Sequence, residues 1–585
     1  MFRARIEAAI GAAIQSIQAE GDLGQFEVPY FSVEVPEQAS HGDYATNIAM
    51  IIAKVAKRNP MEFAEMLAKK LSAGGGAFIE KAEVAAPGFI NITLSPDALR
   101  EAAAGALAKP DAWGTSDAGG GKTARLDYFQ LNIAKRPHVG HLRSAVIGDA
   151  LKRMLLASGW RAVADTHVGD WGTQFGILLK AYKENRENIE NIERVGDPFD
   201  ALEELYQKEV ALMEMDPARR DLAKEEFANL ERGDPENRKI WQWMVDISMR
   251  KLTESANRLG LLPFELHLGE SAYEADMPPI VEEALAKSIA LKKDDGAVTV
   301  DLSAEGLDEA VLTKSDGAST YLLRDLATIK RAKQDLGFAK NLYVVDVRQA
   351  HHFRQVFRVA ELLGFEGAGE STHVAFGFMT LPEGAMSTRK GTAISLDVVL
   401  DEAEKRARAV IAEKNPGLAN ADAVAKAVGI GALKYFDLAH HRASDIVFRW
   451  EEAFSFDGNS GPYLQYAHAR LKSILRKVGA ENAENIKNIE KIENIEMDGL
   501  EHRLMVAALR LSETVEDALV DYAPSHLANY LFSIAQLANE FYHSHPVSQE
   551  PDAGTRSIRI ALVALVALTL SRGLNLLGIQ TPEEM

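Results

Sequence analysis

The middle of the chain alternates between strand-like and helix-like segments, which limits the folds it can adopt. The run ARLDYFQL (124–131) reads as a strand and leads through a turn into a predicted helix from about Val139 to Leu156. Further strands are predicted at Val298–Leu302, Leu342–Val345 and His373–Phe378, with helices between them. Strand–helix–strand alternation favours an α/β fold with a mostly parallel sheet covered on both faces.

Three domains are predicted along the 585 residues. Residues 1–112 combine a first helix with the strands YFSVEV and GFINITLS, and Pro110 and the glycines at 119–121 mark a linker. Residues 122–395 form the α/β domain, with insertions at about 180–300. Residues 396–585 show helical patterning almost alone and predict an α-helical bundle. Two low-complexity segments, ENIENIERV (187–195) and ENIKNIEKIENIEM (484–497), are interpreted as surface insertions.

Composition excludes some classes of protein and leaves others open. Cysteine is absent, which excludes disulfides and cysteine zinc sites and is consistent with a cytoplasmic protein. No uninterrupted apolar run approaches the roughly 20 residues of a membrane span, so no membrane partner is expected. The formal charge of −20 argues against an RNA partner, but it is a sum over the whole molecule. RNA would meet only one face, which can still be basic. A candidate local basic track comprises Lys135, Arg136, Arg143, Lys152, Arg153 and Arg161.

The turn after the strand at 124–131 carries a nucleotide-binding pattern. In NIAKRPHVGH (132–141), His138 and His141 can donate hydrogen bonds to phosphate oxygens, and Gly140 allows close approach to the backbone. The N-terminus of the following helix also favours an anion. Two alternatives remain for these residues alone: histidines on one exposed helix face, or a metal site, for which no third ligand is near in sequence.

Several stretches together resemble the arginyl-tRNA synthetases, a family of class I aminoacyl-tRNA synthetases. They are LDYFQLNIAKRPHVGHLRSAVIGDALKRML (126–155), HVGDWGTQFG (167–176), YLLRD (321–325), YVVD (343–346), Gln349 with HF (352–353), SGPYLQY (460–466) and the final LLGIQTPEEM. The resemblance implies ATP-dependent activation of L-arginine, with Mg²⁺ and without zinc, followed by transfer to the terminal ribose 2′-OH of the cognate arginine tRNA. It further implies release of AMP and pyrophosphate, activation that requires bound tRNA, and a monomer.

The resemblance also assigns candidate site residues. Those implied for ATP are His138, Gly140, His141, Gly169, Asp170 and Gln174. Those implied for arginine are Asp127, Asn132, His138, Tyr321, Asp325 and Gln349. The chemistry agrees in part, because a planar, charged guanidinium requires carboxylates and a flat aromatic wall. Gln130 stands where relatives often have a small residue, so no direct substrate contact is expected from it.

The second ATP loop of class I enzymes departs from its usual Lys-Met-Ser-Lys-Ser pattern. Here the matching stretch is AMSTRKG (385–391), in which both lysines of the pattern are missing. Met386, Ser387, Arg389 and Lys390 are its candidate ATP contacts. Lys135 is the first candidate for the cation that stabilises departing pyrophosphate, and Arg389 and Lys390 come next.

Tyr463, Tyr466 and Arg470 are candidate tRNA contacts in the helical region, where core packing is the alternative. The N-terminal domain resembles one that grips the tRNA elbow. Two competing functions stay open at this point. One is a nucleotidylyltransferase that shares the histidine signature, and the other is a catalytically inactive synthetase-like binding protein.

Overall fold

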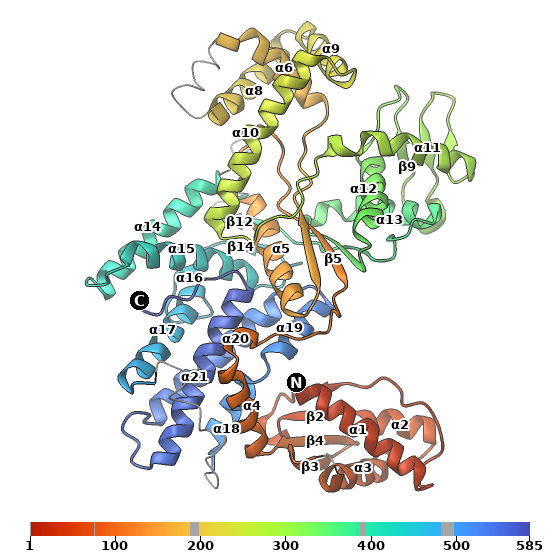
Figure 1. The fold of residues 1–585 in the computed structure, drawn as a ribbon. Coiled ribbons are helices and arrows are strands. Elements are labelled where there is room, and N and C mark those ends of the chain that lie inside the picture. Colours follow the sequence, from red (N-terminus) through yellow and green to blue (C-terminus); the bar gives the residue numbers. More distant parts are fainter. Residues whose placement is uncertain (1, 75, 188–197, 383, 386–393, 481–495) are drawn as a thin grey trace.

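A computed structural model describes residues 2–74, 76–187, 198–382, 384–385, 394–480 and 496–585. Both low-complexity segments lie almost wholly outside these described residues. In Figure 1 the N-terminal domain lies at one end of the molecule, beside the helices of the C-terminal region, and the central parallel sheet lies between that bundle and two outer lobes. The three predicted regions are therefore spatially distinct.

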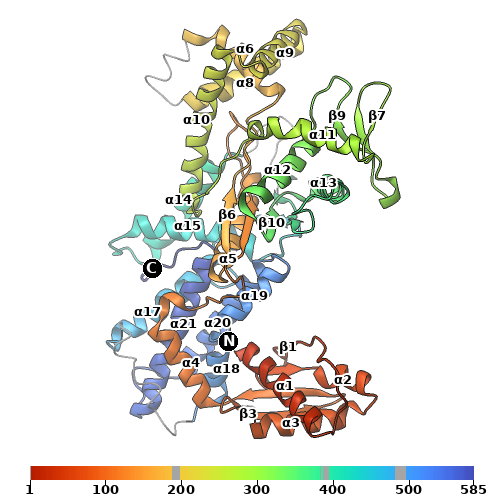
Figure 2. The same ribbon diagram turned by 45° about the vertical axis from the view of Figure 1, so that its right-hand side comes forward.

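The N-terminal domain packs three helices against a small sheet. Helix α1 (Phe2–Ala19) buries Ile6, Ile10, Ile14 and Ile17, whose spacing places them on one helical face. Helices α2 (Ile48–Ala56) and α3 (Pro60–Gly74) pack against an antiparallel sheet of order β1-β2-β4-β3, with bounds Val33–Glu34, Tyr44–Thr46, Phe89–Leu94 and Ile79–Ala85 (Figure 2). Helix α4 (Pro96–Ala108) then leaves the domain and packs on the C-terminal bundle.

The central sheet has the order β11-β10-β5-β6, and every pair in it is parallel. Its strands are Ser371–His373, Lys340–Tyr343, Thr123–Asp127 and Arg161–Asp165. Successive side chains of a strand point to opposite faces. Leu342 of β10 and Val344 just after it accordingly join the core shared with α5 (Gly140–Ala157). Tyr343 and Val345 join the core of α12 (Tyr321–Leu336) and α13 (Ala350–Leu363). Helices therefore cover both faces, as predicted.

Three strand predictions needed correction. The predicted strand 124–131 ends at Asp127, because Phe129 adopts a positive φ of 57° and turns the chain. Strand β11 of the main sheet ends at His373, where the prediction 373–378 began. Residues 298–302 do contain a strand, β8 (Val298–Val300), but it pairs antiparallel with β7 (Leu291–Lys292) and β9 (Ala310–Thr313) in a separate sheet.

A helical lobe interrupts the sheet between β6 and β10. It contains α6 (Thr173–Glu184), α8 (Pro198–Met215), α9 (Ala218–Glu231) and the long α10 (Pro235–Leu259), which returns towards the sheet (Figure 1). A short helix, α11 (Met277–Ala286), follows before the β7–β9 sheet. These elements correspond to the insertion predicted at about 180–300.

From residue 396 the described chain is almost entirely helical. The helices are α14 (Leu396–Lys414), α15 (Ala421–Leu438), α16 (Trp450–Ala453), α17 (Gly461–Lys477), α18 (Gly499–Ala508), α19 (Leu511–Val520), α20 (Ser525–Ser544) and α21 (Ala553–Leu576). One small sheet joins this region to the preceding one, since β14 (Ile446–Val447) pairs in parallel with β12 (Met379–Leu381), which also pairs with β13 (Gly384–Ala385). The domain boundary at residue 395 stays a prediction.

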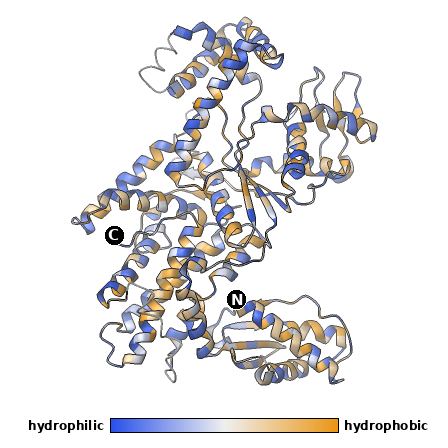
Figure 3. Cartoon of the chain, in the orientation of Figure 1, coloured by the Kyte–Doolittle hydropathy of each residue, from blue (hydrophilic) through white to orange (hydrophobic). Residues whose placement is uncertain are grey.

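Helix α21 is long and apolar enough, by length and composition, to cross a membrane. Within the fold, 67% of its apolar window is buried, and it packs against α17, α18 and α20. Figure 3 shows hydrophobic residues along this helix and its neighbours. A buried core helix passes the same test of length and composition. Because most of its apolar window is packed against neighbouring helices, α21 is the core helix of the bundle.

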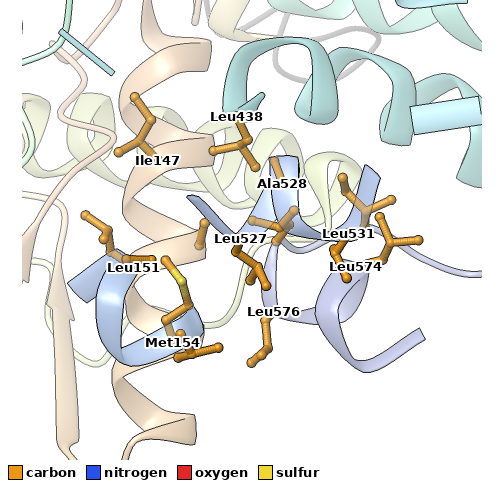
Figure 4. Packing of buried hydrophobic residues seen from close by; sticks show 14 of the residues in the cluster. Ile147, Leu151, Met154, Leu438, Leu527, Ala528, Leu531, Leu574 and Leu576 are labelled. Atoms are coloured by element: carbon orange, nitrogen blue, oxygen red, sulfur yellow. The ribbon is translucent and has the colours of Figure 1, made fainter. Parts of the chain in front are cut away.

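Helix α5 joins the parallel sheet to the bundle. Its residues Ile147, Leu151 and Met154 face Leu438 of α15 and Leu527 of α20 (Figure 4). Near its N-terminus, Arg143 is 1% exposed and its Nε lies 3.1 Å from Asp437 of α15. The helix that begins at the histidine turn is thus packed directly into the C-terminal region.

Candidate active site

The turn after β5 is held in place by backbone hydrogen bonds. The Gly169 amide donates to Leu131 (2.9 Å) and the Ile133 amide donates to Gly169 (3.3 Å), which ties the two predicted nucleotide segments together. Ala134 has a positive φ of 58°, and its amide donates to Ser248 Oγ. A Cβ on Gly169 would lie 2.4 Å from Asn132 Oδ1. Glycine is therefore required at 169 for Asn132 to keep its present position.

The two signature histidines have defined tautomers. The backbone amide of His138 donates to Nδ1 of His141 (3.1 Å), and the amide of Gly140 donates to Nδ1 of His138 (3.1 Å). Because each Nδ1 accepts a hydrogen bond, each neutral ring carries its proton on Nε2. Burial lowers the pKa of both rings, and the neighbouring His138 adds to this effect at His141, whose pKa falls to about 3. Both rings are neutral Nε2–H donors at neutral pH.

The histidine turn also contacts the chain that follows the second ATP loop. The Val139 amide donates to Ile394 (3.1 Å), and the Leu396 amide donates to Pro137 (3.0 Å). Met386, Ser387, Arg389 and Lys390 themselves lie outside the described residues. The described chain that follows this loop, from Ile394, is hydrogen-bonded to the histidine turn.

A cavity of about 570 Å³ opens beside this turn, at the carboxyl ends of β5 and β10. This is the edge at which parallel α/β sheets bind ligands. Five predicted residues line the cavity: Asn132, Gly169, Tyr321, Asp325 and Gln349. Sequence reasoning missed other lining residues, which are Gln130, Leu131, His167, Glu270, Arg324, Tyr343, Arg348, His352 and Phe353. Most of these residues lie in the stretches that carry the family resemblance, which assigned them no role, whereas Glu270 and Arg348 lie outside those stretches.

The cavity contains two carboxylates with polar partners. His352 Nε2 lies 2.6 Å from Asp325 Oδ2, and Arg324 Nη1 donates to Glu270 Oε2 at 3.0 Å. Burial raises the pKa of Glu270 although Arg324 opposes the shift. Tyr321 is 69% exposed at the start of α12, one turn before Asp325. An acidic wall beside an accessible aromatic ring fits a planar cation.

Asp127 lies beneath the cavity and does not line it. The residue is 1% exposed, and Arg125 Nη2 donates to its Oδ2 at 3.2 Å. The second oxygen, Oδ1, accepts from Gln130 Nε2 at 2.5 Å. The predicted direct contact between Asp127 and a guanidinium is therefore not preformed, because both carboxylate oxygens have internal partners.

Other predicted ATP residues have structural partners. Asp170 Oδ1 accepts from the Ser271 amide (2.9 Å) and Oδ2 from the Ser271 hydroxyl (2.6 Å). Gln174 Nε2 donates to the Gly169 carbonyl (3.2 Å). Lys135 is exposed and its Nζ lies 5.7 Å from the ring centre of Tyr206 in the helical lobe. These residues lie next to the turn, and their contacts with ATP stay predictions.

The predicted basic track is wrong for most of its members. Arg143 and Lys152 are buried, Lys152 against Glu265 (2.8 Å). Arg153 pairs with Asp149 (2.8 Å), and Arg136 with Asp200 and Glu203. Of the six, only Lys135 and Arg161 are exposed and have no carboxylate partner among the described residues. Charge spacing along a helix could not reveal which of these side chains faces the core.

The predicted tRNA residues share a second cavity, of about 270 Å³, between α17 and α20. Tyr463, Tyr466 and Arg470 line it, and Arg470 stacks over the Tyr542 ring at 4.0 Å. Tyr466 and Tyr542 remain 43% and 40% exposed. The additional lining residues Phe456, Asn539 and Tyr542 were missed, since no local pattern links α20 with α17. Exposed aromatic rings with arginine are typical of a surface that stacks unpaired bases.

One group in the described chain has the donor atoms to hold a metal ion: Asp498, Glu501 and His545. Each already has a structural role. Asp498 and Glu501 form the capping box of α18, Glu501 pairs with Arg559 (2.7 Å), and His545 pairs with Asp498. These pairings account for the cluster without a metal.

Comparison with known proteins agrees with this geometry. Residues 106–450 match the family described as tRNA synthetases class I (R), catalytic domain. Residues 464–585 match the DALR anticodon binding domain, and residues 4–94 match the arginyl tRNA synthetase N terminal domain. The fold and site are therefore those of a class I aminoacyl-tRNA synthetase.

The relatives identify the branch of this class. The chain is 39% identical to arginine–tRNA ligase of Chloroflexus aggregans over 96% of its own length and 97% of the relative. It is 36% identical to that of Limosilactobacillus fermentum, over 98% and 99%. The solved Thermus thermophilus arginyl-tRNA synthetase matches with a TM-score of 0.80 and 27% identity, covering 100% of both chains. The chain belongs to the arginyl-tRNA synthetase family.

Proposed function

We propose that this protein is an arginine–tRNA ligase, which activates L-arginine with ATP and transfers it to the terminal ribose 2′-OH of arginine tRNA. One observation carries the proposal beyond family membership. The cavity at the carboxyl edge of the sheet combines Asp325 and Glu270 with the open ring of Tyr321, and its wall includes Asn132, which begins the turn that leads to His138 and His141. A site for a planar cation thus lies beside a site for phosphate oxygens.

In the first step, a carboxylate oxygen of arginine attacks the α-phosphorus of ATP, and the bond to pyrophosphate breaks. The protein supplies position and charge stabilisation more than covalent chemistry. His138 and His141 donate Nε2–H to the oxygens on which charge develops. Mg²⁺ bound to the ATP would supply positive charge to the phosphates during this step.

In the second step, the ribose 2′-OH attacks the activated carbonyl and AMP leaves. Asp325 and Tyr321 bind the guanidinium, with Asp127 contributing negative charge from beneath. Asn132, His138 and Gln349 orient the α-amino and α-carboxylate groups. Gly140, Gly169, Asp170 and Gln174 shape the ATP side, together with Met386 and Ser387 of the second loop. Lys135 stabilises pyrophosphate, with Arg389 or Lys390 as the next candidates.

The tRNA contacts both ends of the molecule. We place unpaired bases of the anticodon loop on Tyr463, Tyr466 and Arg470 in the α17–α20 cavity, and the tRNA elbow on the N-terminal domain. Helix α5 supports the requirement for tRNA in activation, because it runs from the histidine turn into the bundle that would hold the anticodon (Figure 4). The proposal includes a cytoplasmic monomer that uses neither zinc nor a membrane.

Arginine-dependent exchange of pyrophosphate into ATP, measured with and without arginine tRNA, tests this function. We expect exchange only when arginine and tRNA are both present. Exchange without tRNA would contradict the tRNA requirement alone. Absence of exchange and of tRNA charging with cognate tRNA would contradict the ligase proposal and favour an inactive binding protein.

Asp325→Asn tests the arginine pocket. Removing a half-buried carboxylate from a charged pair costs about 2–5 kcal/mol, so the kcat/KM for arginine should fall roughly 30-fold to several-thousand-fold. The KM for ATP should stay within about twofold. Asp335→Asn is a matched control on the same helix, where Asp335 is exposed and outside the cavity. Equal losses for arginine and ATP would show that Asp325 does not read the guanidinium.

A further inference from the structure

Gln130 covers the carboxylate of Asp127 from the cavity side. The glutamine lines the cavity, whereas Asp127 does not. Its Nε2 donates to Asp127 Oδ1 at 2.5 Å. A ligand in the cavity therefore meets the Gln130 side chain before it can reach the aspartate.

The orientation of this amide follows from its partner. A carboxylate at this position only accepts hydrogen bonds, so the NH₂ end of Gln130 must face Asp127 and the carbonyl Oε1 must face away. Among the described residues, none donates a hydrogen bond to Oε1. Gln130 thus has one end fixed by a buried charge, and its remaining acceptor is available to a ligand.

The aspartate is fixed from behind by an unusual residue. Arg125 lies on the same strand, is 1% exposed, and donates to Asp127 Oδ2 (3.2 Å), Asp165 Oδ2 (2.8 Å) and Asn341 Oδ1 (3.0 Å). These contacts span three neighbouring strands of the sheet. The guanidinium of Arg125 therefore occupies the side of Asp127 that faces the core. Moving Asp127 towards a ligand would break this buried ion pair, which is energetically costly.

We propose that Gln130 determines specificity for arginine by accepting an N–H of the substrate guanidinium on Oε1 while Asp127 holds its Nε2. The inference rests on the proposed function and assigns the direct contact to Gln130, with Asp127 as a positioning residue. The carboxylate polarises the amide, which strengthens Oε1 as an acceptor. The guanidinium then meets the carboxylate of Asp325 and the polarised amide of Gln130. This assignment differs from the sequence-based expectation, which gives Gln130 no substrate contact.

One alternative predicts the opposite effect of removing Gln130 on the KM for arginine. If arginine displaces the Gln130 amide and binds Asp127 directly, then Gln130 is a competitor, and removing it should improve arginine binding. Gln130→Ala and Gln130→Met separate the two cases. Both variants remove the acceptor; the first uncovers Asp127, and the second keeps the side-chain length without an amide.

The experiment measures arginine-dependent pyrophosphate exchange in the presence of arginine tRNA, with KM for arginine, KM for ATP and kcat determined separately. We expect both variants to raise the KM for arginine by roughly 10- to 100-fold, because a buried donor–acceptor arrangement loses one member. The KM for ATP should change by less than about twofold. Gln242→Ala is the matched control, since Gln242 also donates Nε2 to a carboxylate, Asp246, at 2.9 Å but lies exposed on α10.

An unchanged or lower KM for arginine in Gln130→Ala would overturn the proposal and favour direct binding by Asp127. Equal increases in KM for arginine and ATP would also overturn it, since they would indicate general damage to the cavity. If Gln130→Ala does not fold, the volume-conserving Gln130→Met decides the outcome by the same criteria. A wild-type protein without arginine-dependent exchange would instead contradict the proposed function, and the role of Gln130 would fall with it.

Discussion

Replacing Gly169 with alanine should disturb arginine binding through one atom. The new Cβ would lie 2.4 Å from Asn132 Oδ1, but 3.7 Å from Asn132 Cα. The backbone cannot slide apart, because hydrogen bonds of Gly169 with Leu131 and Ile133 fix the separation of the two segments. Asn132 is exposed, so its amide can rotate away. The substitution therefore moves this amide while leaving the fold intact.

The size of the effect follows from the contact that is lost. A hydrogen bond to a charged group contributes about 1.5–3 kcal/mol, so the KM for arginine should rise roughly 10- to 150-fold. The midpoint of thermal unfolding should fall by less than about 3 °C, since no buried group loses a partner. The KM for arginine is measured by pyrophosphate exchange in the presence of tRNA, at varied arginine and fixed ATP concentrations. Gly105→Ala, on an open face of α4, is the control.

A double-mutant cycle with Asn132→Ala tests whether Gly169→Ala acts through the Asn132 side chain. If Gly169 acts through the Asn132 amide, then Gly169→Ala should add less than about twofold to the KM for arginine in the Asn132→Ala background. Full additivity of the two substitutions would refute the reasoning. An arginine KM for Gly169→Ala equal to that of the wild type would refute it as well.

Three further predictions concern other parts of the molecule. His141→Asn should lower the kcat of activation by about 10²–10³-fold with little change in the KM for arginine. Because the pKa of His141 is about 3, titration of this residue should not change the wild-type kcat between about pH 6 and 8. Burial opposes protonation of His502, but its hydrogen bond and attraction to Asp43 outweigh this and raise its pKa. The Asp43–His502 pair therefore stabilises the domain contact fully below the unfolded pKa of about 6.5 and loses this effect as pH rises through the higher folded pKa. Thermal unfolding should accordingly show lower stability at pH 8 than at pH 6. Asp43→Asn should remove this contribution to the pH dependence. Tyr542→Ala should raise the KM for tRNA about 5- to 150-fold in charging assays, as expected for one stacked base, and unchanged tRNA kinetics would exclude Tyr542 from the interface.

The parts of the site that follow one another in the chain could be predicted from the sequence. The histidine turn is such a case, because strand, turn and helix are consecutive and each leaves a local pattern. The arrangement around Asp127 could not be predicted, since Arg125 points into the core from a strand and its partners Asp165 and Asn341 come from two other strands. Similarly, Glu270 reaches the cavity from a connection about 140 residues beyond the histidine turn, and nothing near it in sequence indicates that destination.

Net charge and charge spacing were the least informative signals. Lys152 and Arg143 occupy positions on α5 that a charge pattern assigns to solvent, yet both are buried with carboxylate partners. Burial of long basic side chains depends on the neighbouring helices of the bundle, which a local pattern does not contain. The fold class was predictable because it depends on periodicity, whereas the position of the basic residues depends on tertiary packing.

The apolar contact between α5 and the bundle has a consequence for dividing this protein into parts. Ile147, Leu151 and Met154 are at most 1% exposed in the intact fold, in which α5 contacts α15, α19 and α21. A fragment that ends near residue 450 would keep α15 but lose α19 and α21, so it would present part of this surface to water and should aggregate. By contrast, the N-terminal domain meets the bundle partly through ion pairs such as Arg3–Asp517 (2.5 Å), which tolerate hydration. Evolution or engineering could therefore exchange the N-terminal domain more readily than it could separate the catalytic region from its helical bundle.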